Sequence, residues 1–115
     1  MSKFDLIIRG GTVATASDTF KTDVGVRAGK IVALGHDLGK AERTIEAEGQ
    51  LVLPGGIEAH CHIEQESSTR IMTADDFYSG SVSAAFGGNT TFIPFAAQHR
   101  GQNLRDVIKT AHDRA

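Results

Sequence analysis

Three features that often mark a class of function are scarce in this 115-residue chain: cysteine, net charge and long apolar segments. Cys61 is its single cysteine, so no disulfide can form within the chain, and we expect a reducing, cytoplasmic compartment. Twelve basic against fourteen acidic side chains leave a net charge of −2. This near balance argues against a nucleic-acid partner or an anionic membrane surface.

The chain has no apolar run near the ~20 residues that cross a bilayer, and its first residues, Met1 to Asp5, lack the apolar core of a secretory signal. We therefore expect neither a membrane segment nor a signal peptide. Hydrophobic residues make up 40% of the chain and charged residues 23%, which is usual for a globular protein. A compact globule of this size buries about two thirds of its unfolded surface, enough for one core.

The first half of the chain is patterned as short strands. Phe4, Leu6 and Ile8 alternate with their neighbours, which is the period of a half-buried strand. Gly10-Gly11 is expected to break this strand, and a new one to begin at Thr12. The region is therefore predicted to be an all-β meander, with a hairpin over 23–34 that turns at Ala28-Gly29, and further strands over 44–47 and 50–53.

The pattern changes at Pro54-Gly55-Gly56, which we take as a domain boundary. A strand is predicted over 57–63 and a helix after it, with Thr73 as N-cap, Asp76 in a capping-box position and an end at Gly87-Gly88. The last predicted elements are an apolar strand over 90–95, with Pro94 near its end, and a helix capped by Asn103. Alternation of strand and helix predicts a parallel sheet.

The residues most informative about chemistry are His60 and His62. Side chains two apart in a strand point to the same side, so the two imidazoles can converge while Cys61 points away. Neutral imidazoles suit Zn²⁺ or a similar borderline metal. A His-x-His pair also recurs by chance, but two buried imidazoles without partners are hard to explain structurally. The pair is therefore a candidate metal site.

Several segments resemble one enzyme family. Residues 6–13 (LIIRGGTV) and 30–35 (KIVALG) resemble the opening strands of cyclic amidohydrolases, and 53–62 (LPGGIEAHCH) resembles their first metal-binding strand. Residues 73–81 (TADDFYSGS) and 87–91 (GGNTT) resemble the hydantoinase and dihydropyrimidinase branch in particular. The resemblance covers essentially the whole chain, with allantoinases and dihydroorotases as close competitors.

The resemblance implies an α/β fold: the start of a (β/α)₈ TIM-like barrel, preceded by strands of a small β-sandwich domain. Residues 1–53 would form the N-terminal part of the sandwich, and residues 54–115 the first two β/α units of the barrel. A closed barrel needs about 250 residues. We therefore interpret the chain as a fragment of a longer protein.

The implied activity is metal-dependent opening of cyclic amides, such as hydantoins and dihydropyrimidines, by metal-activated water. His60 and His62 would be metal ligands, of two Zn²⁺ ions or of Mn, Co or Fe. Family members use a carboxylated lysine, two more histidines and an aspartate from later strands. This chain holds no further catalytic residue and no organic cofactor site, so it is expected to be inactive alone. The partners implied are a small cyclic amide and further copies, as a homotetramer.

Alternatives remain at several levels. The protein could be allantoinase- or dihydroorotase-like, a non-catalytic relative that acts as an assembly protein, or a truncated product with exposed apolar faces. Glu58 shares the parity of the two histidines and is either a partner of the ligands or a filler of the barrel floor. Cys61 is expected to be buried and inert. Solvated loop positions are the favoured interpretation for His99 and for 64–66, although these residues could also reach the site.

Overall fold

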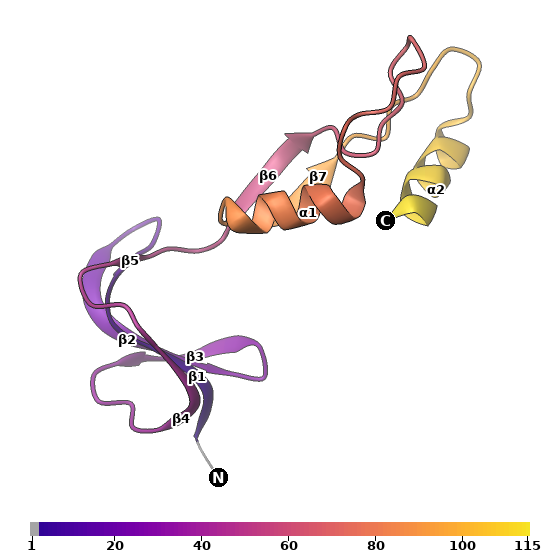
Figure 1. Cartoon of the computed structure of the whole chain (residues 1–115). Helices are drawn as coiled ribbons and strands as arrows, with labels where there is room; N and C mark the ends of the chain where they lie inside the picture. The colour runs from indigo at the N-terminus through magenta and orange to yellow at the C-terminus, as the bar shows by residue number, and fades with distance from the viewer. Residues whose placement is uncertain (1–2) are drawn as a thin grey trace. The chain divides into compact units, whose positions relative to one another are not determined.

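The computed structural model describes residues 3–115. The chain divides into two compact units, Met1–Pro54 and Gly55–Ala115 (Figure 1). None of the helices in the described part is long and apolar enough to cross a membrane. The assignment of the two units to a β-sandwich and to a barrel stays a prediction.

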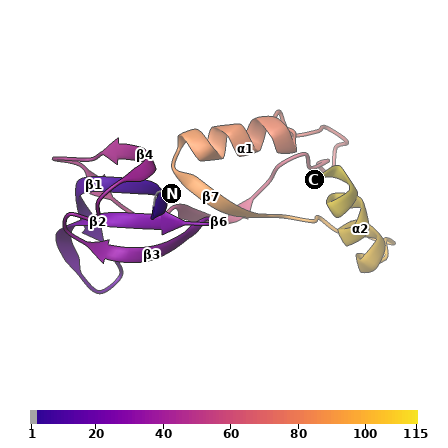
Figure 2. The same cartoon turned by 90° about the horizontal axis from the view of Figure 1, so that it is seen from below.

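The first unit is a five-stranded sheet. Its strands are β1 (Phe4–Ala14), β2 (Thr19–Arg27), β3 (Lys30–Gly35), β4 (Ala41–Glu46) and β5 (Leu51–Val52). Four of them lie in the order β3-β2-β1-β4 (Figure 2), and β5 also pairs with β1. β1 is antiparallel to β2, and β2 to β3, whereas β4 and β5 both run parallel to β1.

The predicted meander was therefore wrong for its last two strands. In a meander β4 would pair with β3, but here the connection after Gly35 carries the chain to the opposite edge of β1. β1 is 11 residues long, so one edge accommodates two short partners. β4 pairs along Phe4 to Arg9 and β5 along Thr12 and Val13. The hairpin over 23–34 was confirmed, with Ala28 and Gly29 at φ 50° and 71° in its turn.

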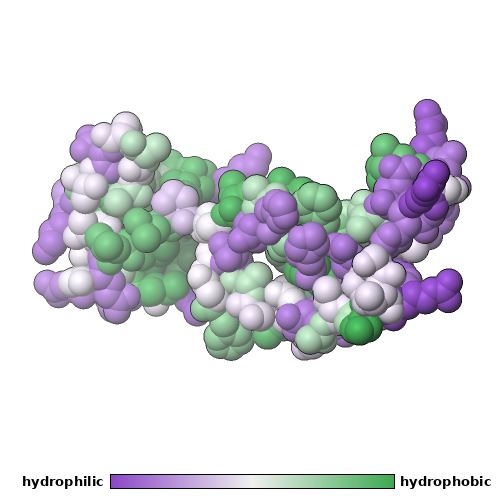
Figure 3. Space-filling view, turned by 90° about the horizontal axis from the view of Figure 1, so that it is seen from above, coloured by the Kyte–Doolittle hydropathy of each residue, from purple (hydrophilic) through white to green (hydrophobic). Residues whose placement is uncertain are grey.

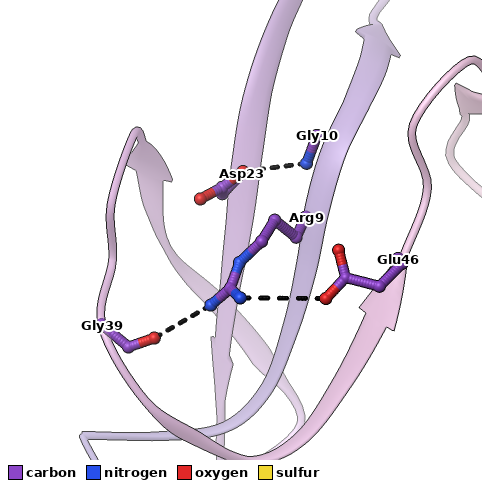
Figure 4. A network of polar contacts seen from close by, with 5 residues as sticks. All are labelled: Arg9, Gly10, Asp23, Gly39 and Glu46. Carbon is purple, nitrogen blue, oxygen red and sulfur yellow. Dashed lines mark hydrogen bonds and ion pairs between the residues drawn. The ribbon is translucent and has the colours of Figure 1, made fainter.

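The predicted break at Gly10-Gly11 was also wrong, because β1 continues through it as a bulge. The pairing register with β2 shifts between Ile8 and Gly11, and Gly10 has φ +71°, which glycine adopts without strain. The Gly10 N–H donates to Oδ1 of the buried Asp23 at 2.9 Å (Figure 4). Beside it, Arg9 contacts the Gly39 carbonyl at 3.0 Å and the Glu46 carboxylate at 3.8 Å. The Asp23 carboxylate thus accepts the hydrogen bond from the Gly10 N–H, which the bulge leaves without a partner in the ladder.

The core of the first unit differs from the alternation expected for β1. Ile7 is fully buried, with none of its surface exposed, while Leu6 and Ile8 are only half-buried. Phe4 is buried because its ring lies against Gly25, where an added Cβ would come within 2.7 Å of Cε1. The buried apolar side chains are Phe4, Ile7, Val13, Val24 and Ala47.

The second unit is a β-α-β-α segment whose two strands, β6 and β7, pair in parallel, as predicted. Pro94 is the last residue of β7, where its missing N–H removes no interior ladder bond. Among the residues described in this unit only Gly80 is buried, against the side chain of Ile63. The elements are β6 (Gly56–Cys61), α1 (Phe77–Phe86), β7 (Asn89–Pro94) and α2 (Leu104–Arg114).

Helix α1 begins later than predicted. Asp76, not Thr73, is the N-cap: its Oδ1 accepts from the Ser79 N–H at 2.7 Å, and Ser79 Oγ accepts from the Asp76 N–H at 3.1 Å. This is a capping box with serine in place of the usual glutamate. The predicted end at Gly87 and the Asn103 cap of α2 were both confirmed.

Candidate metal centre

The two histidines of the His-x-His pair lie at the carboxyl end of β6. His60 is on the strand and His62 follows directly after it, with ring centroids 5.4 Å apart in a T-shaped arrangement. Both are exposed in this chain. The intervening Cys61 carbonyl accepts a ladder bond from Phe95 at 2.9 Å. The backbone at this strand end therefore brings both imidazoles to one place.

Phe95 packs against both rings. Its centroid lies 4.7 Å from that of His60 and 5.1 Å from that of His62, stacked on the latter at 20°. Phe95 follows the last residue of β7, and parallel strands end at the same edge of a sheet. From the sequence, Phe95 was expected only as the last residue of an apolar strand over 90–95. The missed signal was that an aromatic directly after the second strand must lie beside the residue directly after the first.

Among residues 3–115, Gln65 makes the one hydrogen bond to an imidazole of this pair. Its Oε1 lies 2.6 Å from Nδ1 of His62. Gln65 is half-buried, whereas Glu66 is exposed. The sequence favoured a solvated loop position for Gln65, so its contact with a candidate ligand is new information from the tertiary structure.

Glu58 contacts the backbone of the site, not its rings. Its Oε1 accepts from the His60 N–H at 2.8 Å.

Burial, and secondarily the Glu58 charge, raise the pKa of the Cys61 thiol above its ordinary value. A raised pKa means less thiolate and lower reactivity. The expected inertness of Cys61 thus has a physical basis, although the residue is half-buried rather than buried.

The donor set fits part of a metal site. Two imidazoles are appropriate donors for a borderline metal, but zinc sites use at least three protein ligands. Within residues 3–115, no group of three or more His, Cys, Asp and Glu residues could hold a metal ion. His60 and His62 can therefore contribute two ligands, and a complete site needs donors from elsewhere.

The other candidates of the loop region lie around a cavity of about 330 Å³ in the second unit. His99 lines it together with the segment 63–66 and one face of α2. The Arg114 guanidinium donates to the Glu64 carbonyl at 2.9 Å across this space. The structure thus gathers His99 and the 64–66 loop around one cavity.

No family model matches the chain. Among curated proteins it is 44% identical to a D-hydantoinase of Ralstonia pickettii over 104 residues, which are 90% of this chain and 22% of that protein. It is 39% identical to a D-hydantoinase of Geobacillus stearothermophilus over 110 residues, covering 95% and 23%. An allantoinase of Salmonella paratyphi B is 40% identical over 113 residues, covering 97% and 24%.

Solved structures show similarity to the same group of enzymes. A D-hydantoinase structure matches with a TM-score of 0.90 and 42% identity over 97% of this chain and 24% of that one. A dihydropyrimidinase from Brevibacillus agri matches with a TM-score of 0.87 and 41% identity, over 95% and 24%. An N-acyl-D-glutamate deacylase from Bordetella bronchiseptica, solved with zinc, matches at 0.61 and 28% over 84% and 20%. The chain spans about a quarter of the length of the curated relatives it matches.

Proposed function

Because this chain is related to the hydantoinases and dihydropyrimidinases and corresponds to the N-terminal portion of these cyclic amidohydrolases, we propose that it belongs to an enzyme that hydrolyses a ring amide. The substrate class would be hydantoins or dihydropyrimidines. Residues 1–53 would be part of a β-sandwich and residues 54–115 the first two units of a (β/α)₈ barrel. The parallel β6-α1-β7-α2 arrangement supports this assignment.

The observation that carries the proposal is the convergence of His60 and His62 at the carboxyl end of β6. In barrel enzymes the catalytic groups lie at this end of the strands. A divalent metal held there would supply an activated water and polarise the amide carbonyl. Two Zn²⁺ ions, or Mn, Co or Fe, are the proposed occupants.

The chain's own residues would do the positioning. His60 and His62 would each offer a ring nitrogen, and Phe95 would pack against both rings and restrict their rotation. Glu58 would hold the His60 backbone through its 2.8 Å hydrogen bond. The remaining ligands and the general base would come from outside residues 3–115, since no third donor joins the pair there. Assembly as a homo-oligomer, a tetramer by resemblance, belongs to the same proposal.

The test is a double substitution, His60→Ala with His62→Ala, in the enzyme that contains this chain. We expect bound metal, measured by elemental analysis, and ring opening of hydantoin and dihydrouracil to be lost together. His112→Ala, at the exposed end of α2, is the matched control and should retain both. Full metal content in the double variant would contradict the assignment of the ligands.

An allantoinase is the second candidate, favoured by the 40% identity to the Salmonella protein. Both candidates use the same metal chemistry, so the histidine variants cannot distinguish them. Parallel assays with hydantoin, dihydrouracil and allantoin can. Turnover of allantoin alone would favour the second candidate, and bound metal without turnover of any ring would favour the non-catalytic assembly role.

A further inference from the structure

We propose that Gln65 is a positioning residue for His62: its side-chain carbonyl keeps the imidazole proton on Nδ1 and so leaves Nε2 as the nitrogen that faces a metal. This inference rests on the proposed function for the metal, but the hydrogen bond itself is a property of the chain alone. It concerns a residue that touches a ligand and does not touch the reacting atoms.

The first argument is the geometry at His62. Gln65 Oε1 lies 2.6 Å from Nδ1, well within hydrogen-bond distance. A carbonyl oxygen can only accept, so in the neutral imidazole Nδ1 carries the proton and Nε2 is the unprotonated nitrogen. Phe95 stacks on the same ring, with centroids 5.1 Å apart and planes 20° from parallel. Stacking limits tilt of the ring, and the hydrogen bond limits its rotation.

The second argument is that the Gln65 backbone is itself fixed. Its N–H donates to Thr73 Oγ1 at 3.1 Å, and its carbonyl accepts from the Thr73 N–H at 3.0 Å. The Thr73 hydroxyl in turn donates to the Asp75 carbonyl at 3.3 Å. Thr73 therefore holds Gln65 from two sides. With the backbone so held, only the side-chain rotamers of Gln65 remain to be ordered when it binds His62.

The third argument is the turn that brings Gln65 back to His62. Glu64 adopts a left-handed conformation, φ 47°, which is costly for a residue with a side chain. Three contacts stabilise it: its N–H donates to the Asp75 carbonyl at 2.9 Å, its carboxylate accepts from the Phe77 N–H at 3.2 Å, and its carbonyl accepts from Arg114. The chain thus stabilises a strained turn whose consequence is the contact between Gln65 and His62.

His60 provides an internal comparison. Within the described part of the chain its imidazole makes ring contacts with His62 and Phe95 and has no hydrogen-bond partner, and Glu58 accepts from its backbone N–H instead. Nothing there sets the position of its ring proton. The two candidate ligands should therefore differ in tautomer preference, because the partner of one ring nitrogen decides which nitrogen is free.

The experiment is long-range ¹H–¹⁵N NMR of the histidine rings in the metal-free chain, about two pH units above the usual imidazole pKa of ~6.5. We expect the His62 proton on Nδ1. Gln65→Leu removes the acceptor and should release the proton to the tautomer mixture of an unrestrained imidazole. Gln65→Glu keeps an acceptor at the same reach and should restore Nδ1–H. Gln98→Leu, another glutamine of the second unit, which bonds to Gln102, is the matched control.

The metal arm of the test is titration with Co²⁺ of the same variants, made in the enzyme that contains this chain. Loss of a partner that orients a ligand typically lowers metal affinity by roughly 10- to 100-fold, so we expect this for Gln65→Leu and near-normal binding for Gln65→Glu. Should Gln65→Leu perturb the backbone amide spectrum, Thr73→Val, which removes one of the two holds on Gln65, should give a smaller change in the same direction.

The two proposals can fail separately. A His62 proton on Nε2 in the unchanged chain, or an unaltered tautomer and Co²⁺ affinity in Gln65→Leu, would overturn the role of Gln65. Absence of Co²⁺ binding by the unchanged enzyme that contains this chain would count against the metal site, while the tautomer readout would still decide whether Gln65 holds His62.

Discussion

The two units of this chain bury their side chains to different degrees. The strands of Met1–Pro54 enclose Phe4, Ile7, Val13, Val24 and Ala47, whereas in the described residues of Gly55–Ala115 only Gly80 is buried. Large apolar side chains remain exposed in both (Figure 3). In the second unit they include Phe86, 92% exposed, and Ile57, 68% exposed.

The difference follows from strand direction. Antiparallel neighbours pair through tight hairpins, so β1 to β3 complete a ladder within a short segment, and β4 and β5 then pair with the other edge of β1. Parallel strands need long crossovers and cover on both faces, which one helix and one partner strand do not supply. The unit with the candidate metal centre is therefore the one that depends more on further packing partners.

The largest expected effect tests this contrast with two isoleucines. Ile7→Ala removes a fully buried side chain from β1 and should lower the free energy of unfolding of the first unit by about 2–5 kcal/mol. Ile57→Ala removes an exposed side chain from β6 and should change stability by less than ~0.5 kcal/mol. Urea titration followed at backbone amide signals of each unit measures both. Equal losses would break the comparison.

A smaller effect is expected at the bulge of β1. Asp23→Ala removes the carboxylate that accepts the Gly10 N–H at 2.9 Å. The half-buried donor would lose its partner, at a cost of about 1–3 kcal/mol. Glu42→Ala, on the exposed part of β4, is the control and should be near neutral. Amide hydrogen exchange at Gly10 should accelerate only in the Asp23 variant; unchanged exchange there would contradict this account.

The smallest effect is a pH dependence at helix α1. The hydrogen bond from the Ser79 N–H, foremost, holds the pKa of Asp76 below its usual value. The cap therefore stabilises α1 fully above the unfolded pKa of ~3.9, and this contribution is lost as the pH falls through the lower, folded pKa. Amide exchange across α1 should rise in that acidic range. Asp76→Asn keeps an acceptor without a titrating group and should remove the pH dependence.

The elements that the sequence predicted well depend on neighbouring residues. The hairpin turn needs only Ala28-Gly29 between two apolar strands, the end of α1 only Gly87, and the start of α2 only Asn103. The convergence of His60 and His62 was likewise expected from the period of a strand. Their role as metal ligands stays a proposal.

The failures all involve partners distant in the sequence. The alternation of β1 gave no sign that β4 and β5 would pair parallel to it, since such pairing depends on the path of the connections. Thr73 and Asp76 are both competent caps, and Thr73 is occupied by Gln65 instead. A glycine pair signals a break and a bulge equally well until the strand opposite is known.

The sequence by itself thus determined the local elements, the parallel strand order of the second unit and the pairing of two imidazoles at one strand end, because periodicity and turn chemistry act over a few residues. Only the tertiary structure decided which strands lie next to β1, that Phe95 packs on both histidines, and that Gln65 contacts His62. The first two depend on where separate segments meet in space. The contact of Gln65 with His62 spans only three residues, but it depends on the left-handed turn at Glu64 and on the two hydrogen bonds with Thr73.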